Sequence, residues 1–293
     1  MSVIHDLGYA RYAGERRPPS TIWRVIMRQH LAFAWKTKWR LKPWLLGAAG
    51  ISLVVGTLMY LQKNELVSAL RSVGRPVSWI DGALPMSFDY FRIPAFMVTM
   101  TIGAAVIARD RESGAFTFYF ARPVRPLDYV LGKLAGQLVL MAMIFLIGPV
   151  LLTIFRIAIS ESTREALDQL ILVPKVLLVG TLATWMYAAL PLAVSAVSSR
   201  RTIAFGLWAG YYIMVAKIVA NVGALLWLPL KAFDPGSAVQ SLAMRIFDMT
   251  VQGEKLAPMW AAIISLIVQP AIAVAIIVMM VKREAAGSVG GSG

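Results

Sequence analysis

The sequence contains no cysteine and only two histidines. Without cysteine the chain can form no disulfide, no thiolate-ligated zinc site and no thiol nucleophile. The imidazoles are limited to His5 and His30. We therefore expect neither a catalytic residue nor a metal site in this chain.

Charged residues are also scarce. They make up 15% of the 293 residues, whereas hydrophobic residues make up 58%. Soluble domains usually contain about a quarter charged residues. The composition is therefore that of a membrane protein, although the formal net charge of +14 first raises the question of nucleic-acid binding.

The sequence contains several long apolar windows. A helix needs about 20 mostly apolar residues to cross a hydrocarbon core of roughly 30 Å. Six windows meet this need: residues 43–62, 90–108, 129–155, 172–197, 203–228 and 258–281. We expect an all-α membrane protein with six transmembrane helices over residues 43–281. An N-terminal region (1–42) precedes them, and a tail (282–293) follows that ends in a Gly/Ser-rich run typical of a flexible linker.

The distribution of Lys and Arg residues indicates how the chain is oriented in the membrane. They concentrate in the N-terminal region, in the second loop, at Arg200 and Arg201, and in the tail, whereas the alternate loops hold fewer. The N-terminus has no apolar core typical of a cleavable signal peptide. The positive-inside rule then predicts cytosolic N and C termini. Most of the excess charge faces anionic lipid of the inner leaflet, so we expect contact with membrane lipid and no nucleic-acid partner.

The segment before the first window has the pattern of an amphipathic interfacial helix. Ser20 or Thr21 is suited to cap it. One apolar stripe would face the membrane: Trp23, Ile26, Met27, Leu31 and Ala34. This elbow helix either brackets a partner subunit or only anchors the chain in the cytosolic leaflet.

Between the second and third windows lies a polar stretch, RDRESGAFTFYFARPVRP, at residues 109–126. Its aromatic residues need a cover, which headgroups or a partner protein could provide. Gly114 and Pro126 punctuate it, so we predict a short cytosolic helix over residues 114–121 that lies across the membrane normal. Asp128 is suited to cap the third membrane helix, expected to begin at Tyr129.

Two pairs of glycines lie four residues apart. Gly132 and Gly136 fall in the third window, and Gly206 and Gly210 in the fifth. Such pairs allow close approach of helices. They serve either ordinary packing or a specific dimer seam.

The sequence ARDRESGAFTFYFARPVRPLDYVLGKLAG resembles the signature region of ABC-2 type transporter permeases. There an acidic, Glu-Ser-Gly-like element leads into a coupling helix, followed by Arg-Pro and a Tyr-x-x-Gly-Lys motif that opens the third span. The matching residues are Asp110, Glu112, Ser113, Gly114, Arg122, Pro123, Tyr129, Gly132 and Lys133. Residues 124–126 depart from the family pattern.

The resemblance implies a permease subunit of an ATP-driven exporter in a bacterial inner membrane, working by alternating access. Its implied partners are two copies of a cytosolic ABC ATPase and a second permease copy or a paralogue. This chain has no Gly-x-x-x-x-Gly-Lys-Ser/Thr loop, so ATP and Mg would be bound by the ATPase subunit, and the chain itself would not be an enzyme. Glu112 would bridge to a cytosolic Arg or Lys. The residues implied to couple to the ATPase are Asp110, Glu112, Gly114, Phe116, Phe118, Tyr119 and Arg122.

Lys217 stands about halfway through the fifth window, and Asn221 follows one turn later. A lysine at the centre of a membrane helix costs roughly 2.5–3.5 kcal/mol on insertion scales, so it should avoid lipid. The two residues either line a translocation path, or Lys217 snorkels or pairs with an acid from a re-entrant loop. The external segment after this window contains a helical repeat of Val239, Leu242, Ala243 and Ile246, which predicts an amphipathic helix on or dipping into the outer leaflet. The family resemblance implies re-entrant helices here, and a surface helix is the alternative.

Two other functions remain as alternatives. A membrane-embedded lipid-modifying enzyme needs clustered acids or an activated nucleophile, and Asp110, Glu112 and Asp128 form no familiar metal motif. A secondary transporter or channel would need more intramembrane ionisable residues than Lys217.

Overall fold

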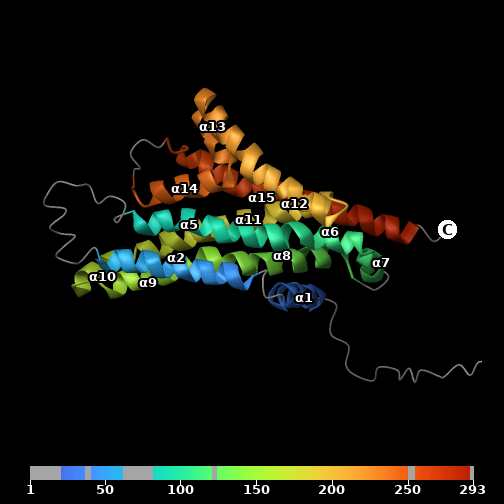
Figure 1. The fold of residues 1–293 in the computed structure, drawn as a ribbon, viewed down its shortest axis with the longest axis horizontal. Helices are drawn as coiled ribbons and strands as arrows, with labels where there is room; N and C mark the ends of the chain where they lie inside the picture. The colour runs from blue at the N-terminus through green and yellow to red at the C-terminus, as the bar shows by residue number, and fades with distance from the viewer. Residues whose placement is uncertain (1–20, 37–40, 62–81, 121–123, 250–254, 291–293) are drawn as a thin grey trace, which may run out of the picture.

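The computed structural model describes residues 21–36, 41–61, 82–120, 124–249 and 255–290 (Figure 1). These parts of the chain form helices and no strand. Six of their helical runs are long and apolar enough to span a membrane: Lys42–Leu61, Ala83–Glu112, Pro126–Ala158, Thr163–Val197, Arg201–Leu226 and Met259–Gly287. The predicted all-α, six-span architecture is confirmed.

Several spans are built from more than one helical segment. The first is α2 (Lys42–Leu61), and the last is α15 (Met259–Gly290). The second, third and fifth each contain a π-helical segment, and the fourth joins two α-helices. The second span consists of α5 (Ala83–Val98), η2 (Thr99–Gly103) and α6 (Ala104–Glu112), and the third of α8 (Pro126–Ala142), η3 (Met143–Ile147) and α9 (Gly148–Ala158). The fourth consists of α10 (Thr163–Gln169) and α11 (Leu172–Val197), and the fifth of α12 (Arg201–Ala209), η4 (Gly210–Val215) and α13 (Ala216–Leu226).

Four shorter elements lie outside the spans. They are α1 (Ile22–Lys36), α7 (Ala115–Phe120), the 3-10 helix η5 (Leu228–Phe233) and α14 (Pro235–Ile246). The elbow helix and the short helix between the second and third spans are therefore present where the sequence predicts them. Ser20, Ala121 and Arg122 lie outside the described residues.

Figure 1 shows the spans running side by side along the long axis of the molecule. One end, here called the basal end, carries α7 and the C-terminal part of α15, and α1 lies across the flank of α8 toward this end. The opposite end, called the distal end, carries α10 and α14. The segment α12–α13 leans away from the other spans, so that the tip of α13 stands apart from them.

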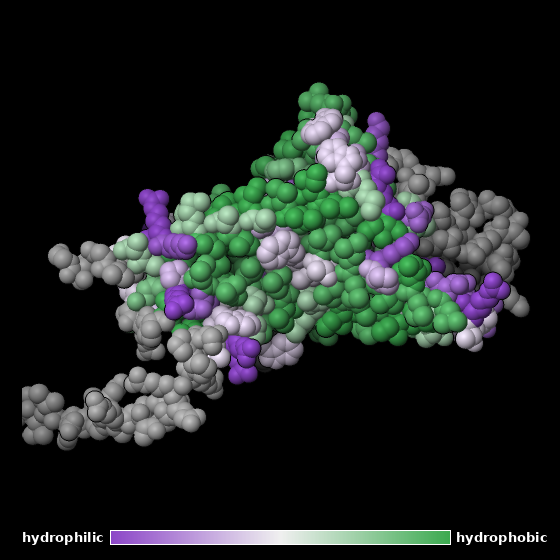
Figure 2. Space-filling model, turned by 180° about the vertical axis from the view of Figure 1, so that it is seen from behind, coloured by the Kyte–Doolittle hydropathy of each residue, from purple (hydrophilic) through white to green (hydrophobic). Residues whose placement is uncertain are grey.

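The face of the bundle that Figure 2 shows is apolar along its middle and carries polar residues toward its two ends. Leu53, Leu207 and Ile272 are among the large apolar side chains that the sides expose. In water such exposure would be costly, but toward lipid tails it is favourable. The distribution agrees with a belt that faces hydrocarbon.

The second and fourth spans form the centre of the bundle. Their apolar windows are the most buried of the six, and α11 packs against α15, α6 and α8. Between α6 and α11, the hydroxyl of Ser195 accepts hydrogen bonds from the backbone N–H groups of Ile107 at 3.0 Å and Ala108 at 2.9 Å. These donors follow η2, where π-helical bonding changes the backbone register. A buried hydroxyl from the neighbouring span thus satisfies them.

The segment after the fifth span is not a surface helix. Most residues of α14 are buried, and the helix packs against α5, α11 and α15. Its apolar repeat is flanked by small residues, Ser237, Ala238 and Ser241, which let it enter the bundle between larger helices. The surface alternative considered from the sequence is therefore wrong.

The third span also begins differently from the prediction. α8 starts at Pro126, with Arg125 as its N-cap, and Asp128 lies in its first turn. Proline is favoured at the first helical position because its missing N–H has no helical partner there. Asp128 is thus not the cap, although a carboxylate in the first turn remains favourable for the helix dipole.

Candidate functional site

A tight turn at Gly114 separates α6 from α7. Gly114 adopts φ +66°, a conformation that glycine tolerates without strain. Its N–H donates to the carbonyl of Arg111 at 3.0 Å, and its own carbonyl accepts from the hydroxyl of Thr117 at 2.7 Å. The turn lets the chain leave the second span and form α7 at the basal end.

Just before this turn, in the last part of α6, Asp110 belongs to a buried polar triad. Its Oδ2 lies 2.6 Å from Nζ of Lys133 and accepts a hydrogen bond of 2.8 Å from the hydroxyl of Tyr129. All three side chains are buried. Since a buried charge is tolerated when it is paired and hydrogen-bonded, the triad fixes α6 against α8. The sequence resemblance included Tyr129 and Lys133, but it did not indicate that they meet Asp110.

The aromatic side of α7 is covered by the chain itself. The ring of Tyr129 packs edge-on against Phe116, Tyr119 and Phe120, with ring centroids 5.3, 5.3 and 6.4 Å away. Phe118 points elsewhere and is 76% exposed. Of the four aromatic residues that needed a cover, Phe118 is the one that the described chain leaves open.

The last turn of α6 is joined to three further helices. Glu112 accepts a hydrogen bond of 3.3 Å from the backbone N–H of Arg201, at the start of α12, and lies 4.0 Å from the Nε of the same residue. Arg111 donates to the carbonyl of Ser198, just after α11, at 3.0 Å, and pairs with Glu284 of α15 at 3.1 Å. The basic residue that Glu112 was expected to contact is thus Arg201. Because α7 follows α6 directly, these contacts would transmit a displacement of α7 to α11, α12 and α15.

α1 packs into the flank of α8 at the two predicted glycines. A Cβ atom at Gly132 would lie 2.6 Å from Cβ of Ile26, and one at Gly136 would lie 2.6 Å from Cδ2 of His30. Both distances are too short for any real side chain. The pair Gly132 and Gly136 therefore serves packing within the chain. At Gly206 and Gly210 an added Cβ would meet nothing within 4 Å, so that pair lies on an open face.

His30 is held in this contact as a neutral ring. Its Nε2 lies 3.3 Å from Oε1 of Gln137, to which it donates as the Nε2–H tautomer. Burial, and secondarily the positive charge of Lys133, lower the pKa of His30 from 6.5 to about 3. The interface between α1 and α8 therefore favours the uncharged imidazole.

α1 also reaches α6 and α7. The hydroxyl of Tyr119 donates to Oε1 of Gln29 at 3.3 Å, and the guanidinium of Arg109 stacks 3.5 Å above the ring of Phe33. Burial raises the pKa of Tyr119 above its usual 10.0, with a further contribution from the charge of Asp110, so the phenol stays protonated.

A groove of about 440 Å³ opens between α1 and α7. Gln29 is its polar residue, and the rest of its lining is apolar or aromatic: Ile22, Val25, Ile26, Ala115, Phe118, Tyr119 and Val124. An apolar groove beside an exposed phenylalanine is suited to receive part of another protein. This groove and the outer face of α7 form the candidate docking site.

The other predicted site residues lie far along the fifth span. Nζ of Lys217 is 2.6 Å from Oδ2 of Asp234, whose side chain is fully buried. Asp234 caps α14 by accepting from the backbone N–H of Ser237 at 2.7 Å. Asn221 is exposed. The pairing agrees with the structural alternative for Lys217, and the path-lining role of the two residues stays a prediction.

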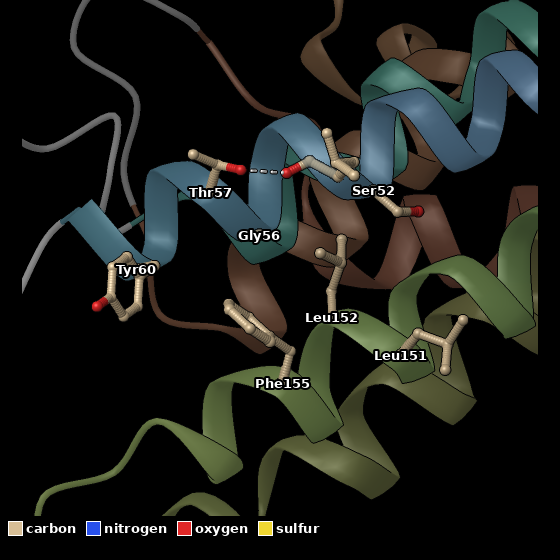
Figure 3. Close-up of a pocket in the computed structure, with 8 residues that line it drawn as sticks. Ser52, Gly56, Thr57, Tyr60, Leu151, Leu152 and Phe155 are labelled. Atoms are coloured by element: carbon tan, nitrogen blue, oxygen red, sulfur yellow. Dashed lines mark hydrogen bonds between the residues drawn. The ribbon is translucent and has the colours of Figure 1, made fainter.

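A second groove opens sideways between α2 and α9, with a volume of about 480 Å³. Leu152 and Phe155 extend from α9 toward Gly56 of α2 (Figure 3). The hydroxyls of Ser52 and Thr57 donate to carbonyls of their own helix. The groove thus offers mainly hydrocarbon surface and suits an acyl chain or an apolar helix.

Metal-binding side chains are not clustered in the described parts of the chain: no group of three or more His, Asp or Glu residues is placed to hold an ion. Asp110, Glu112 and Glu284 at the basal end are instead paired with Lys133, Arg201 and Arg111 respectively.

Comparison with known proteins gives one family. The model of the family described as ABC-2 family transporter protein matches residues 43–284. A search of curated proteins gives no match. The matched range covers nearly all of the six spans, together with α7 and the buried triad.

Proposed function

The chain belongs to the ABC-2 transporter family, and we propose that it couples ATP hydrolysis by a separate subunit to export of a substrate. As a permease of this family it is a multi-pass transmembrane component of an ABC transporter. The proposal concerns how the chain is driven and in which direction cargo moves.

One arrangement carries the proposal: α7 is exposed on one face and firmly attached to the spans on the other. Its outer face presents Phe118 beside the groove of α1. Its inner face rests on Tyr129, which is bonded to Asp110. A partner that moves α7 would therefore move α6 and α8 with it, because tightly packed protein interiors transmit displacement.

The partner would supply the ATP chemistry. This chain has a single Gly-Lys pair, Gly132–Lys133, and both residues are buried in the packing of α8. We infer that ATP and Mg are bound by two copies of a soluble ATPase subunit, each docked on an α7.

A second permease is the other partner. The faces of α2, α12 and α13 expose large apolar side chains, and Gly206 and Gly210 leave an open strip on the fifth span. A copy of this chain or a paralogue would pack there. Closure of the ATPase pair would then tilt the spans on both sides of a shared path, giving alternating access.

We place the chain in a bacterial inner membrane, as the sequence resemblance implies, and the charge distribution supports an orientation with both ends of the chain in the cytosol. The basal end carries Arg109, Arg111, Arg200 and Arg201. Under the positive-inside rule this end faces the cytosol, where the ATPase is found.

The test is co-purification of the tagged chain with ATPase subunits from its native membrane, followed by measurement of ATP hydrolysis. We expect Phe118→Arg to reduce ATPase association strongly, since it places a charge at an apolar contact. Gly114→Trp should do the same, because it strains the turn. Tyr60→Ala removes an exposed aromatic residue from the last turn of α2, away from α7, and is the control. Unchanged association in both basal variants would refute docking at α7.

A further inference from the structure

A cleft of about 200 Å³ lies between α1, α6 and α12, apart from the groove that faces α7. Its lining combines two guanidinium groups with aromatic and aliphatic side chains: Phe33, Thr101, Ala105, Val106, Arg109, Arg201 and Phe205. We propose that this cleft binds the phosphate headgroup of an anionic lipid from the leaflet at the basal end.

The two arginines stand at the mouth of the cleft. Arg109 lies in the last turn of α6, and Arg201 is the first residue of α12. The backbone N–H of Arg201 at the start of α12 already donates to Glu112 at 3.3 Å, so the charge that a ligand meets here is that of the two guanidinium groups. The mouth therefore gathers positive charge from two separate spans.

Both arginines can serve a phosphate in their observed positions. Arg109 stacks the flat face of its guanidinium on Phe33. Hydrogen bonds to phosphate use the edge of the guanidinium, so stacking and phosphate binding are compatible. Arg201 lies 4.0 Å from Glu112, at the limit of an ion pair, and its side chain is 57% exposed. Glu112 is the acidic residue that the structure places beside Arg201.

The rest of the cleft is suited to hydrocarbon. From Arg109 the lining of α6 continues through Val106 and Ala105 to Thr101, a distance of about 12 Å at the rise of a helix. On α12, Phe205 lies one turn after Arg201, and its neighbours Ile203 and Leu207 are exposed on the side of the bundle. A charged mouth that leads to an apolar wall, open toward the bilayer, fits an amphiphile better than a soluble phosphate.

The proposal does not depend on ATPase coupling. A bound lipid would bridge the elbow helix and the fifth span, and it could be a resident lipid or a cargo molecule that shares the same headgroup chemistry. In either case the ligand is recognised by its phosphate at Arg109 and Arg201 and by its chain along Phe205.

The test measures lipid binding to the purified full chain by native mass spectrometry. The probes are phosphatidylglycerol and phosphatidylcholine with identical acyl chains, and soluble glycerol 3-phosphate as a competitor. We expect preferential retention of phosphatidylglycerol, and a loss of about tenfold in its apparent affinity in Arg109→Gln/Arg201→Gln, because charge-assisted contacts to both guanidiniums disappear. Arg24→Gln/Arg28→Gln, which removes the same two positive charges from the exposed face of α1, should leave retention unchanged.

Two further variants separate binding from folding. Arg201→Gln alone changes an exposed side chain, and Ala105→Leu narrows the apolar wall without removing a charge; both should weaken retention while the thermal unfolding midpoint is kept. Equal retention in these variants and in the wild type would overturn the proposal. Displacement of the lipid by equimolar glycerol 3-phosphate would overturn the assignment to a lipid. Transport measured with and without phosphatidylglycerol then distinguishes a resident lipid from cargo, since a resident lipid is retained through turnover.

Discussion

Nζ of Lys133 lies 2.6 Å from Oδ2 of Asp110, and both side chains are buried between α6 and α8. The pair stands at the root of α7, where the sequence changes from apolar span to polar turn. It connects the candidate docking site to the interior of the bundle.

Removing one partner of this pair should destabilise the protein more than removing both. Asp110→Asn leaves the ammonium of Lys133 buried without a counter-charge, a change that costs roughly 3–5 kcal/mol in comparable sites. Asp110→Asn/Lys133→Met leaves no uncompensated charge and should recover part of the loss. Thermal unfolding of the detergent-solubilised protein is the measurement. A double variant as unstable as the single one would show that the charge balance is unimportant here.

Enlarging Gly136 should displace α1 from α8. A leucine there collides with His30, and overpacking of this kind typically costs about 1–3 kcal/mol. Because the chain has no cysteine, Gln29→Cys and Tyr119→Cys can be joined selectively by a short bis-maleimide, and the yield reports the position of α1 relative to α7. Gly136→Leu should lower this yield.

Gly210→Leu is the matched control for that experiment, since a Cβ atom added at Gly210 meets nothing within 4 Å. The cross-linking yield should stay at the wild-type level, whereas association with a second permease should weaken if the open strip of the fifth span is its seam. Loss of cross-linking in both variants would mean that α1 responds to disturbance anywhere in the bundle.

Acidification should loosen α1. The folded protein keeps His30 neutral down to about pH 3, whereas the exposed ring takes up a proton near 6.5. The unfolded or detached state therefore binds more protons between these values, and stability falls as the pH drops below 6.5. At pH 5 the expected loss is about 2 kcal/mol. Unfolding midpoints at pH 5 and pH 7.5 test this for the wild type, and His30→Phe should reduce the difference; an equally large difference in that variant would place the pH sensitivity elsewhere.

Lys217→Met should alter substrate-stimulated ATP hydrolysis of the assembled transporter while assembly survives. The lysine pairs with Asp234, which caps α14, so its loss leaves a buried carboxylate without its cation and loosens the fifth span from α14. Lys217→Arg keeps the charge and should behave nearly as the wild type. Unchanged stimulation and transport in Lys217→Met would assign the pair to structure alone.

The arrangement of spans could be predicted because each apolar window is a local property of the sequence. The position of α7 could be predicted for a similar reason, since Gly114 permits a turn and Pro126 begins a new helix. The second span begins at Ala83, seven residues before the predicted window, which missed residues 83–89 because they contain Pro85 and Asp89, and these interrupt the apolar pattern. The charge of Asp89 is paired with Arg92 at 3.2 Å on the same helix. Periodicity and capping rules thus locate helices better than their ends.

What the sequence could not provide is the choice of contacts between distant helices. The aromatic residues of α7 indicated that a cover was needed, but Tyr129 could be identified as that cover only once α7 and α8 were placed together. The glycines of α8 indicated a close neighbour without naming α1. Asp234 gave a local signal, since Asp-Pro-Gly-Ser is a typical helix start, yet its pairing with Lys217 depends on the reversal of the chain through η5.

The contacts of Arg111 and Glu112 leave out the first span. Through them and the triad, the base of α6 is tied to α8, α11, α12 and α15, whereas α2 packs on α5 and α9. A force applied at α7 thus reaches these four helices through short polar contacts, and reaches the first span through its packing on α5 and α9. We therefore expect α2 to shift less than the other spans when α7 is displaced.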